Sequence, residues 1–155
     1  MLGTDPAKIA SDAGIVFIGR VRTPWSERGD CPRNLREARE RGGETSLLLD
    51  GPYRPGLDGL EPGRTVIVLY WLDRARRDLI VQKPRYRETA TGVFNLRSPV
   101  RPNSIGIAIT EIRAVDMAAG RVETGTLDCI DGTPLIDIKP WFESTDLPPG
   151  FTKAE

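Results

Sequence analysis

Three separate segments of the chain carry polar residue types that suit ligand binding. The first, residues 30–34 (DCPRN), is typical of a rigid proline turn that presents Pro32, the guanidinium of Arg33 and the carboxamide of Asn34 side by side. Such donors suit a planar hydrogen-bonding ligand. A simple turn with an exposed arginine gives the same pattern, so this segment alone indicates no site.

The second segment, residues 97–106 (RSPVRPNSIG), combines two prolines with Arg97 and Arg101, which lie four residues apart, and with Asn103. Prolines reduce the conformational entropy of the unfolded chain, so the segment can hold these polar groups in fixed positions for a ligand. A purely structural loop rarely needs so many polar groups. We therefore predict a binding site in this segment.

The third segment, residues 128–141 (DCIDGTPLIDIKPW), contains an Asp-Gly-Thr-Pro turn at 131–134. The backbone amides and the carboxylate of this turn suit a hydroxyl-bearing or cationic ligand. The alternation that follows places Asp137 and Lys139 on the same face of a strand. A turn followed by an internal ion pair fits the same residues, and the pattern alone does not separate the two interpretations.

Short strands and tight turns are the elements that must position these segments. The 155 residues fit one domain, 39% of them are apolar, and the 16 Gly and 13 Pro disfavour long helices. One short helix is expected at 35–41 (LREARER), before Gly42 and Gly43. A hairpin turn is expected at Ala119-Gly120, and no regular structure at 51–64. β-Branched runs predict strands at 15–22, 45–50, 65–73, 77–86, 91–98, 104–120 and 121–132.

About seven strands at this spacing predict an all-β protein, either a barrel or a sandwich, with one short helix. The chain shows no alternation of strands and helices, which disfavours a doubly wound nucleotide-binding fold. We expect an N-terminal arm at residues 1–13, a single domain at 14–142 and a C-terminal tail at 143–155.

The charge pattern excludes several classes of function. Lysines and arginines number 22, as do aspartates and glutamates, so no overall field attracts the protein to a polyanion. The absence of histidine removes Ser-His and Cys-His catalysis and every zinc site that needs an imidazole. Cys31 and Cys129 are expected to be reduced. No leader or transmembrane pattern is present, so we expect a soluble, cytoplasmic protein without a membrane partner.

Basic residues nevertheless concentrate in one segment, between residues 74 and 101, where only Asp78 and Glu88 are acidic. This excess predicts a local basic patch suited to phosphates. Solvated strand edges that block aggregation explain the same excess equally well. The eight basic residues are Arg74, Arg76, Arg77, Lys83, Arg85, Arg87, Arg97 and Arg101.

Taken together, these segments resemble a known family. Residues 14–25 (GIVFIGRVRTPW), 31–34 (CPRN), 92–106 (GVFNLRSPVRPNSIG) and 127–141 (LDCIDGTPLIDIKPW) stand in the order and at about the spacing of the TsaA-like domain of the TrmO family of tRNA methyltransferases. The resemblance covers about residues 14–142. It implies a single antiparallel β-barrel that forms a homodimer. It also implies binding of S-adenosylmethionine (SAM) and methylation of N6 of threonylcarbamoyladenosine beside the tRNA anticodon.

The resemblance also implies a role for individual residues. At three places the chain departs from the family pattern: Asn34 replaces a glutamine, Asp73-Arg74 replaces His-Gln, and Ser104 replaces the second proline of Arg-Pro-Asn-Pro. The residues expected to hold the cofactor are Pro32, Arg33, Asn34, Asp73, Arg74, Arg97, Ile107, Asp131, Gly132, Thr133 and Pro134. Those expected to hold the substrate are Arg101, Asn103 and Lys139.

Methyl transfer from a sulfonium is an in-line displacement, so the protein mainly aligns the donor and the acceptor. Without histidine, a carboxylate such as Asp73 or Asp131 is the candidate to stabilise the sulfonium and accept a proton. The chain ends soon after Trp141, so we expect it to lack the C-terminal RNA-gripping domain of some relatives. We expect first a tRNA methyltransferase, second a SAM-binding regulatory or scaffold module without transferase activity, and third a cofactor-free nucleic-acid-binding barrel.

Overall fold

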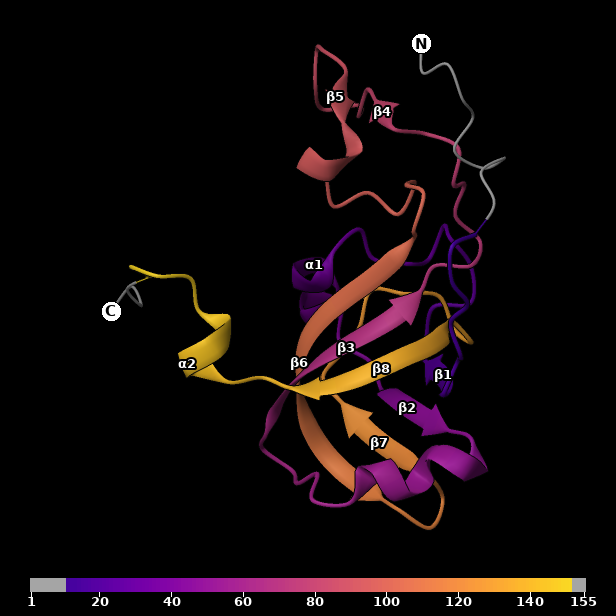
Figure 1. Cartoon of the computed structure of the whole chain (residues 1–155), viewed down its shortest axis with the longest axis vertical. Coiled ribbons are helices and arrows are strands. Elements are labelled where there is room, and N and C mark those ends of the chain that lie inside the picture. The colour runs from indigo at the N-terminus through magenta and orange to yellow at the C-terminus, as the bar shows by residue number, and fades with distance from the viewer. Residues whose placement is uncertain (1–10, 152–155) are drawn as a thin grey trace.

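A single antiparallel sheet forms the body of the molecule in the computed structural model, which describes residues 11–151. β8 pairs with both β3 and β1, so the sheet closes on itself (Figure 1). The six strands, in the order in which they pair, are β1 (Gly19–Arg22), β2 (Thr45–Leu49), β7 (Arg121–Thr124), β6 (Ile105–Asp116), β3 (Thr65–Trp71) and β8 (Pro134–Pro140).

The remaining elements lie outside this closed sheet. A short hairpin projects from one end of the body and holds the strands β4 and β5, which pair only with each other (Figure 1). The elements outside the sheet are the helices α1 (Leu35–Arg41) and α2 (Glu143–Asp146), the 3₁₀ turns Gly51–Leu57 and Val93–Asn95, and the strands β4 (Val81–Gln82) and β5 (Thr91–Gly92).

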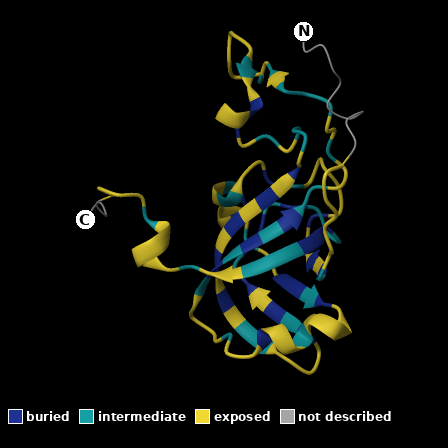
Figure 2. Cartoon of the chain, viewed as in Figure 1, coloured by how far each residue is buried: buried dark blue, intermediate teal, exposed yellow. Residues whose placement is uncertain are grey.

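Alternation along β3 and β6 builds the core. Val66, Val68 and Tyr70 of β3 point inward, and β6 alternates between buried and exposed positions along most of its length (Figure 2). The inward position opposite Tyr70 is Gly106, where a Cβ atom would lie 2.1 Å from the tyrosine ring. A glycine is therefore needed here to make room for an aromatic ring inside the sheet.

The outer side of the same two strands is apolar. Ile105, Ile107 and Ile109 are each 40–46% exposed along β6. Their cross-strand partners on β3 are Trp71, Leu69 and Ile67, in that order. Partners in an antiparallel pair project from the same face, so six large apolar side chains form one outer surface, which we call the β3–β6 face.

The prediction of a mostly β protein with a short helix at residues 35–41 is confirmed, as is the turn at Ala119-Gly120, where Gly120 has a φ of 68°. The first strand, expected at 15–22, begins only at Gly19. β2 ends at Leu49 and turns into a 3₁₀ helix, so residues 15–17 pair with no strand in the described part of the chain. That 3₁₀ helix, Gly51–Leu57, also corrects the expectation that residues 51–64 form no regular structure.

The strand expected at residues 91–98 forms only at Thr91–Gly92. The guanidinium of Arg101 donates hydrogen bonds to the carbonyls of Val93 and Leu96, which curls this segment into a 3₁₀ turn. The expected arm at 1–13 and tail at 143–155 lie partly outside the described residues. Between residues 11 and 151, no helix is long and apolar enough to cross a lipid bilayer.

Candidate active site

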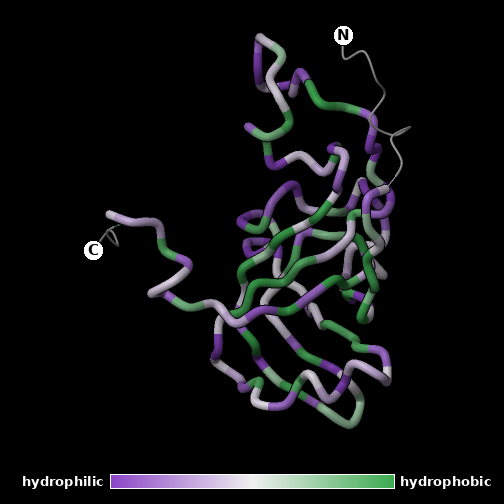
Figure 3. The backbone as a smooth tube through the Cα atoms, in the orientation of Figure 1, coloured by the Kyte–Doolittle hydropathy of each residue, from purple (hydrophilic) through white to green (hydrophobic). Residues whose placement is uncertain are grey.

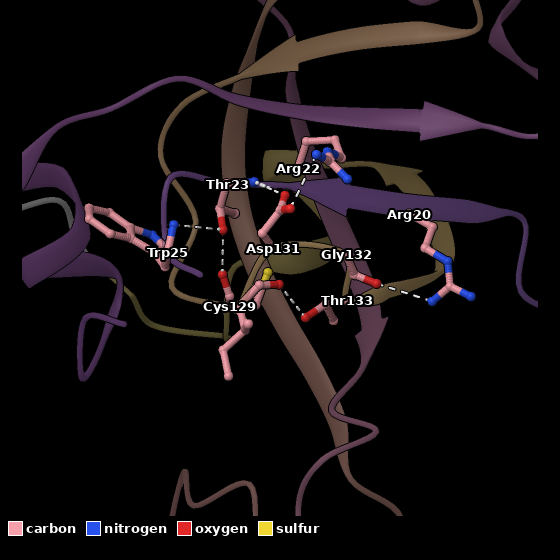
Figure 4. Close-up of polar contacts among 9 residues, drawn as sticks. Arg20, Arg22, Thr23, Trp25, Cys129, Asp131, Gly132 and Thr133 are labelled. Carbon is pink, nitrogen blue, oxygen red and sulfur yellow. Dashed lines mark hydrogen bonds and ion pairs between the residues drawn. The ribbon is translucent and has the colours of Figure 1, made fainter. Parts of the chain in front are cut away.

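The Asp-Gly-Thr-Pro turn is fixed against the chain that leaves β1 (Figure 4). The backbone N–H of Asp131 donates to the carbonyl of Trp25 at 2.7 Å, and that of Gly132 donates to the carbonyl of Val21 at 2.9 Å. Gly132 has a φ of 79°, a conformation that favours glycine. The hydroxyl of Thr133 donates to the carbonyl of Ile130 at 2.6 Å. The turn is therefore rigid before any ligand binds.

The carboxylate of Asp131 already has partners inside the protein. One oxygen accepts a hydrogen bond from the backbone N–H of Thr23 at 3.1 Å, and the other lies 3.2 Å from the guanidinium of Arg22 (Figure 4). This carboxylate ties the turn to the end of β1, so it is a poor candidate to accept a proton.

Asp128 is the residue at which the three segments meet. The phenol of Tyr70 donates to its carboxylate at 3.0 Å, and the thiol of Cys31, next to Pro32, donates to its backbone carbonyl at 3.2 Å. Burial raises the pKa of Asp128, while the hydrogen bond from Tyr70 and the positive charge of Arg97 act in the opposite direction. Asp128 thus interacts with Cys31 through its backbone carbonyl, and with Tyr70 and Arg97 through its partly buried carboxyl group.

The acidity of the neighbouring groups reflects the same burial. Burial raises the pKa of Cys31 to about 11, and the negative charge of Asp128 adds to this effect. Burial, followed by the charge of Asp128, also raises the pKa of Tyr70. At neutral pH Tyr70 and Cys31 are therefore both protonated and both available as donors to Asp128.

A small hollow of about 100 Å³ lies where the chain that follows β3 meets Pro99 and the Asp-Gly-Thr-Pro turn. Three of the predicted residues, Asp73, Arg74 and Thr133, line it, although Asp73 and Thr133 are 60 positions apart in the sequence. Pro99, two residues after Arg97, also lines it. Its lining includes both apolar side chains and the charged side chains of Arg28, Asp73 and Arg74. The lining residues are Arg28, Leu72, Asp73, Arg74, Ala75, Pro99, Ile130 and Thr133.

The other residues expected to hold the cofactor do not line this hollow, and each has its own local role. Arg97 is exposed, and its guanidinium is 3.4 Å from the carbonyl of Ile107, whose side chain lies on the β3–β6 face. Asn34 caps α1 by accepting a hydrogen bond from the backbone N–H of Glu37 at 3.0 Å. Arg33 is exposed and Pro32 is buried, as is Pro134 at the start of β8.

The three residues expected to hold the substrate do not gather in one place. The guanidinium of Arg101 donates to the carbonyl of Ser98 as well as to those of Val93 and Leu96. Lys139 forms an ion pair of 2.5 Å with Asp137, as the structural interpretation of that segment predicted. Lys139 lies opposite Ile67, about 13 Å along β3 from Trp71. Trp71 marks the end of the sheet at which the chain enters β6, two residues after the exposed Asn103.

Asp128 and Tyr70 are not among the residues that the sequence places in the site. The sequence contains one signal for Tyr70: it occupies an inward position in an otherwise aliphatic strand, and a buried phenol normally needs an acceptor. Asp128 carries no local signal, because its partners come from residues 31, 70 and 97 and are brought to it only by the fold.

The residues around the hollow fit a ligand that carries both charges. Leu72, Pro99 and Ile130 offer an apolar surface, and the carboxylate of Asp73 favours a cationic group. Arg28 and Arg74 suit a carboxylate. The hollow is smaller than the roughly 300–1,000 Å³ of ordinary ligand pockets, so a nucleoside-sized ligand would extend beyond it.

Comparison with known proteins gives a consistent result. The family model described as tRNA-methyltransferase O N-terminal domain matches residues 20–147. A probable S-adenosyl-L-methionine-binding protein, VirR of Rhizobium radiobacter, is 40% identical over 83% of this chain and 71% of its own length. The tRNA (adenine(37)-N6)-methyltransferase of Escherichia coli is 32% identical over 80% of this chain and 55% of its own.

The crystal structure of TrmO from Pseudomonas aeruginosa superimposes with a TM-score of 0.70 at 28% sequence identity. The match covers 92% of this chain but only 61% of that one. The chain thus spans about three fifths of the length of the solved structures that it resembles.

Proposed function

Because this chain belongs to the tRNA-methyltransferase O N-terminal domain family, we propose that it is a SAM-dependent methyltransferase that acts on tRNA. The proposed acceptor is N6 of threonylcarbamoyladenosine beside the anticodon. The names of two relatives, an S-adenosyl-L-methionine-binding protein and a tRNA (adenine(37)-N6)-methyltransferase, support this. The observation that carries the proposal is the hollow that joins Asp73, Pro99 and Thr133, from segments far apart in the sequence.

In this proposal the protein works mainly by alignment. Bound SAM would supply an electrophilic methyl group. Arg97 and Arg74 would hold its carboxylate, and Asp73 would lie near its positive charge. The Asp131–Pro134 turn would contribute a rigid wall.

Transfer to N6 releases one proton, and this proton needs an acceptor. Asp131 is engaged by Arg22 and Thr23, which leaves Asp73 and Asp128 as candidates. A carboxyl group with a raised pKa accepts a proton more readily at neutral pH, so the burial of Asp128 favours it.

We also propose that the closed sheet is the antiparallel barrel implied by the resemblance and that two copies associate through the β3–β6 face. Single exposed hydrophobic residues are normal on a protein surface, but six apolar side chains on one outer surface indicate an interaction site. A sheet face of this kind suits a contact between two copies related by a twofold axis. Ile109→Lys should convert the dimer to a monomer in sedimentation velocity. The control is Met117→Lys, since Met117 is similarly exposed but lies outside the face. An equal mass for both variants and the wild type would reject this interface.

Calorimetric titration with SAM tests cofactor binding, and labelled SAM with tRNA from cells that lack the endogenous enzyme tests transfer. Wild-type protein should bind SAM and label the tRNA, and Arg97→Ala should bind SAM more weakly. Arg113→Ala is the control, because Arg113 is an exposed arginine away from the hollow. Binding without transfer would indicate the regulatory or scaffold module. The absence of heat would reject both.

A further inference from the structure

The hairpin of β4 and β5, residues 81–96, projects from the closed sheet, and most of it is exposed (Figures 1 and 2). Its two strands make only two residue pairs, Val81 with Gly92 and Gln82 with Thr91. Hydrophobic and hydrophilic residues are interspersed along it (Figure 3), and Val93 and Leu96 are the only buried residues among positions 81–96. A projection of this kind contributes little to the core, so its side chains are available for contacts with another molecule.

Two aromatic rings on this hairpin are the most exposed large hydrophobic side chains in the part of the chain that the structure describes. Phe94 is 85% exposed and Tyr86 is 78% exposed. One exposed hydrophobic residue on a surface is ordinary. Two aromatic rings presented almost entirely to solvent on one projecting element indicate a binding surface.

The exposure of Phe94 is not the result of a loose chain. Its neighbours Val93 and Leu96 are buried, and the backbone N–H of Val93 donates to the carbonyl of Ile80 at 2.9 Å. Arg101 additionally holds the carbonyls of Val93 and Leu96. The turn is therefore anchored on both sides of Phe94, and its ring is presented in a defined position.

Cations without partners surround the second ring. Lys83, Arg85 and Arg87 flank Tyr86 in the loop between β4 and β5, and none of their side chains forms a hydrogen bond or ion pair with residues 11–151. Other arginines nearby are engaged: Arg76 pairs with Asp78, and Arg77 donates to the carbonyl of Pro102. The loop between β4 and β5 thus carries three free cations and one carboxylate, Glu88.

We propose that residues 81–96 form a docking surface for unpaired nucleotides of an RNA loop, with Tyr86 and Phe94 stacking on bases and the three free cations binding phosphates. Base stacking on exposed aromatic side chains, together with phosphate contacts from lysine and arginine, is how proteins bind single-stranded RNA. Protein interfaces also use aromatic rings and arginine but are depleted in lysine, so the free Lys83 beside these rings favours a polyanion over a protein partner. This inference rests on the proposed function and adds the surface that selects a loop over a duplex.

Fluorescence anisotropy with two RNA probes tests the inference: an anticodon stem–loop and a fully paired duplex of the same length. Tyr86→Leu and Phe94→Leu keep an apolar side chain but remove the stacking ring. Each should weaken stem–loop binding about fivefold or more and leave duplex binding unchanged. Tyr53→Leu is the matched control, because Tyr53 is an exposed tyrosine on a 3₁₀ turn outside the hairpin. Lys83→Ser should weaken binding of both probes and reduce its salt dependence.

Several outcomes separate this inference from the proposed function. If wild-type protein binds the stem–loop and both leucine variants bind it equally well, the docking surface is wrong and the proposed function stands. If the leucine variants reduce the sedimentation mass without changing RNA affinity, the hairpin contacts a protein and the inference is also wrong. If wild-type protein binds SAM but neither RNA, the proposed substrate fails and the inference fails with it.

Discussion

The phenolic hydroxyl of Tyr70 donates a 3.0 Å hydrogen bond to the carboxylate of Asp128, a residue 58 positions later in the chain. The ring of Tyr70 lies inside the closed sheet against Gly106, while Asp128 lies on the segment that leads into the Asp-Gly-Thr-Pro turn. This bond links the core of the sheet to the candidate site. The geometry of the site therefore depends on packing inside the sheet.

Gly106→Ala should destabilise the protein by about 1–3 kcal/mol, because the added Cβ would lie 2.1 Å from the ring of Tyr70 and overpack the core. Urea denaturation measures the free energy of unfolding. Gly92→Ala is the control, since a Cβ added at Gly92 would meet nothing within 4 Å and its backbone is extended. Equal stability of the two variants would contradict this packing.

Asp128→Asn should remove a pH dependence of stability. Burial raises the pKa of Asp128 in the folded state, so the folded protein binds this proton more tightly than the unfolded chain. The contribution to stability is therefore complete below the ordinary value of 3.8 and is lost as the pH rises through the raised pKa. Urea denaturation across this range should show a decline in the wild type that is smaller in the variant. Parallel curves would be evidence against a raised pKa.

Arg101→Lys should loosen the turn that carries Phe94 and Arg97. A lysine cannot span the carbonyls of Val93, Leu96 and Ser98 as the planar guanidinium does. Hydrogen exchange followed by mass spectrometry should show faster exchange in peptides that cover residues 93–98. Arg85→Lys serves as the control, because the side chain of Arg85 forms no hydrogen bond or ion pair with residues 11–151. Unchanged exchange in Arg101→Lys would show that the turn holds without the arginine.

Asn34 is both a helix cap and a proposed cofactor contact, and two substitutions separate these roles. Asn34→Ala should cost about 1 kcal/mol of stability by removing the cap on α1. Asn34→Ser keeps an oxygen that accepts from Glu37 but lacks the amide donor, so it should preserve stability and weaken SAM binding. Denaturation and calorimetry on the same samples give both values. Full SAM affinity in Asn34→Ser would remove the carboxamide from the site.

The sequence predicted local features well where a few neighbouring residues decide the conformation. The helix at Leu35–Arg41 follows from good helix formers between Asn34 and Gly42, and the turn at Gly120 follows from the residues beside it. The prediction for segment 91–98 failed because its strand-like composition was overridden by the guanidinium of Arg101, which binds its carbonyls from outside the segment.

The sequence by itself determined that strands occur around residues 65–73 and 104–120, where the chain turns at Gly120, and which three segments carry the polar groups. β-Branched runs and glycine positions encode these features within a few residues. Only the tertiary structure decided that Asp128 joins Tyr70 to Cys31 and that Arg101 binds the carbonyls of Val93, Leu96 and Ser98. The partners of a long polar side chain depend on which distant segments the closing sheet brings near it, and no local pattern contains that information.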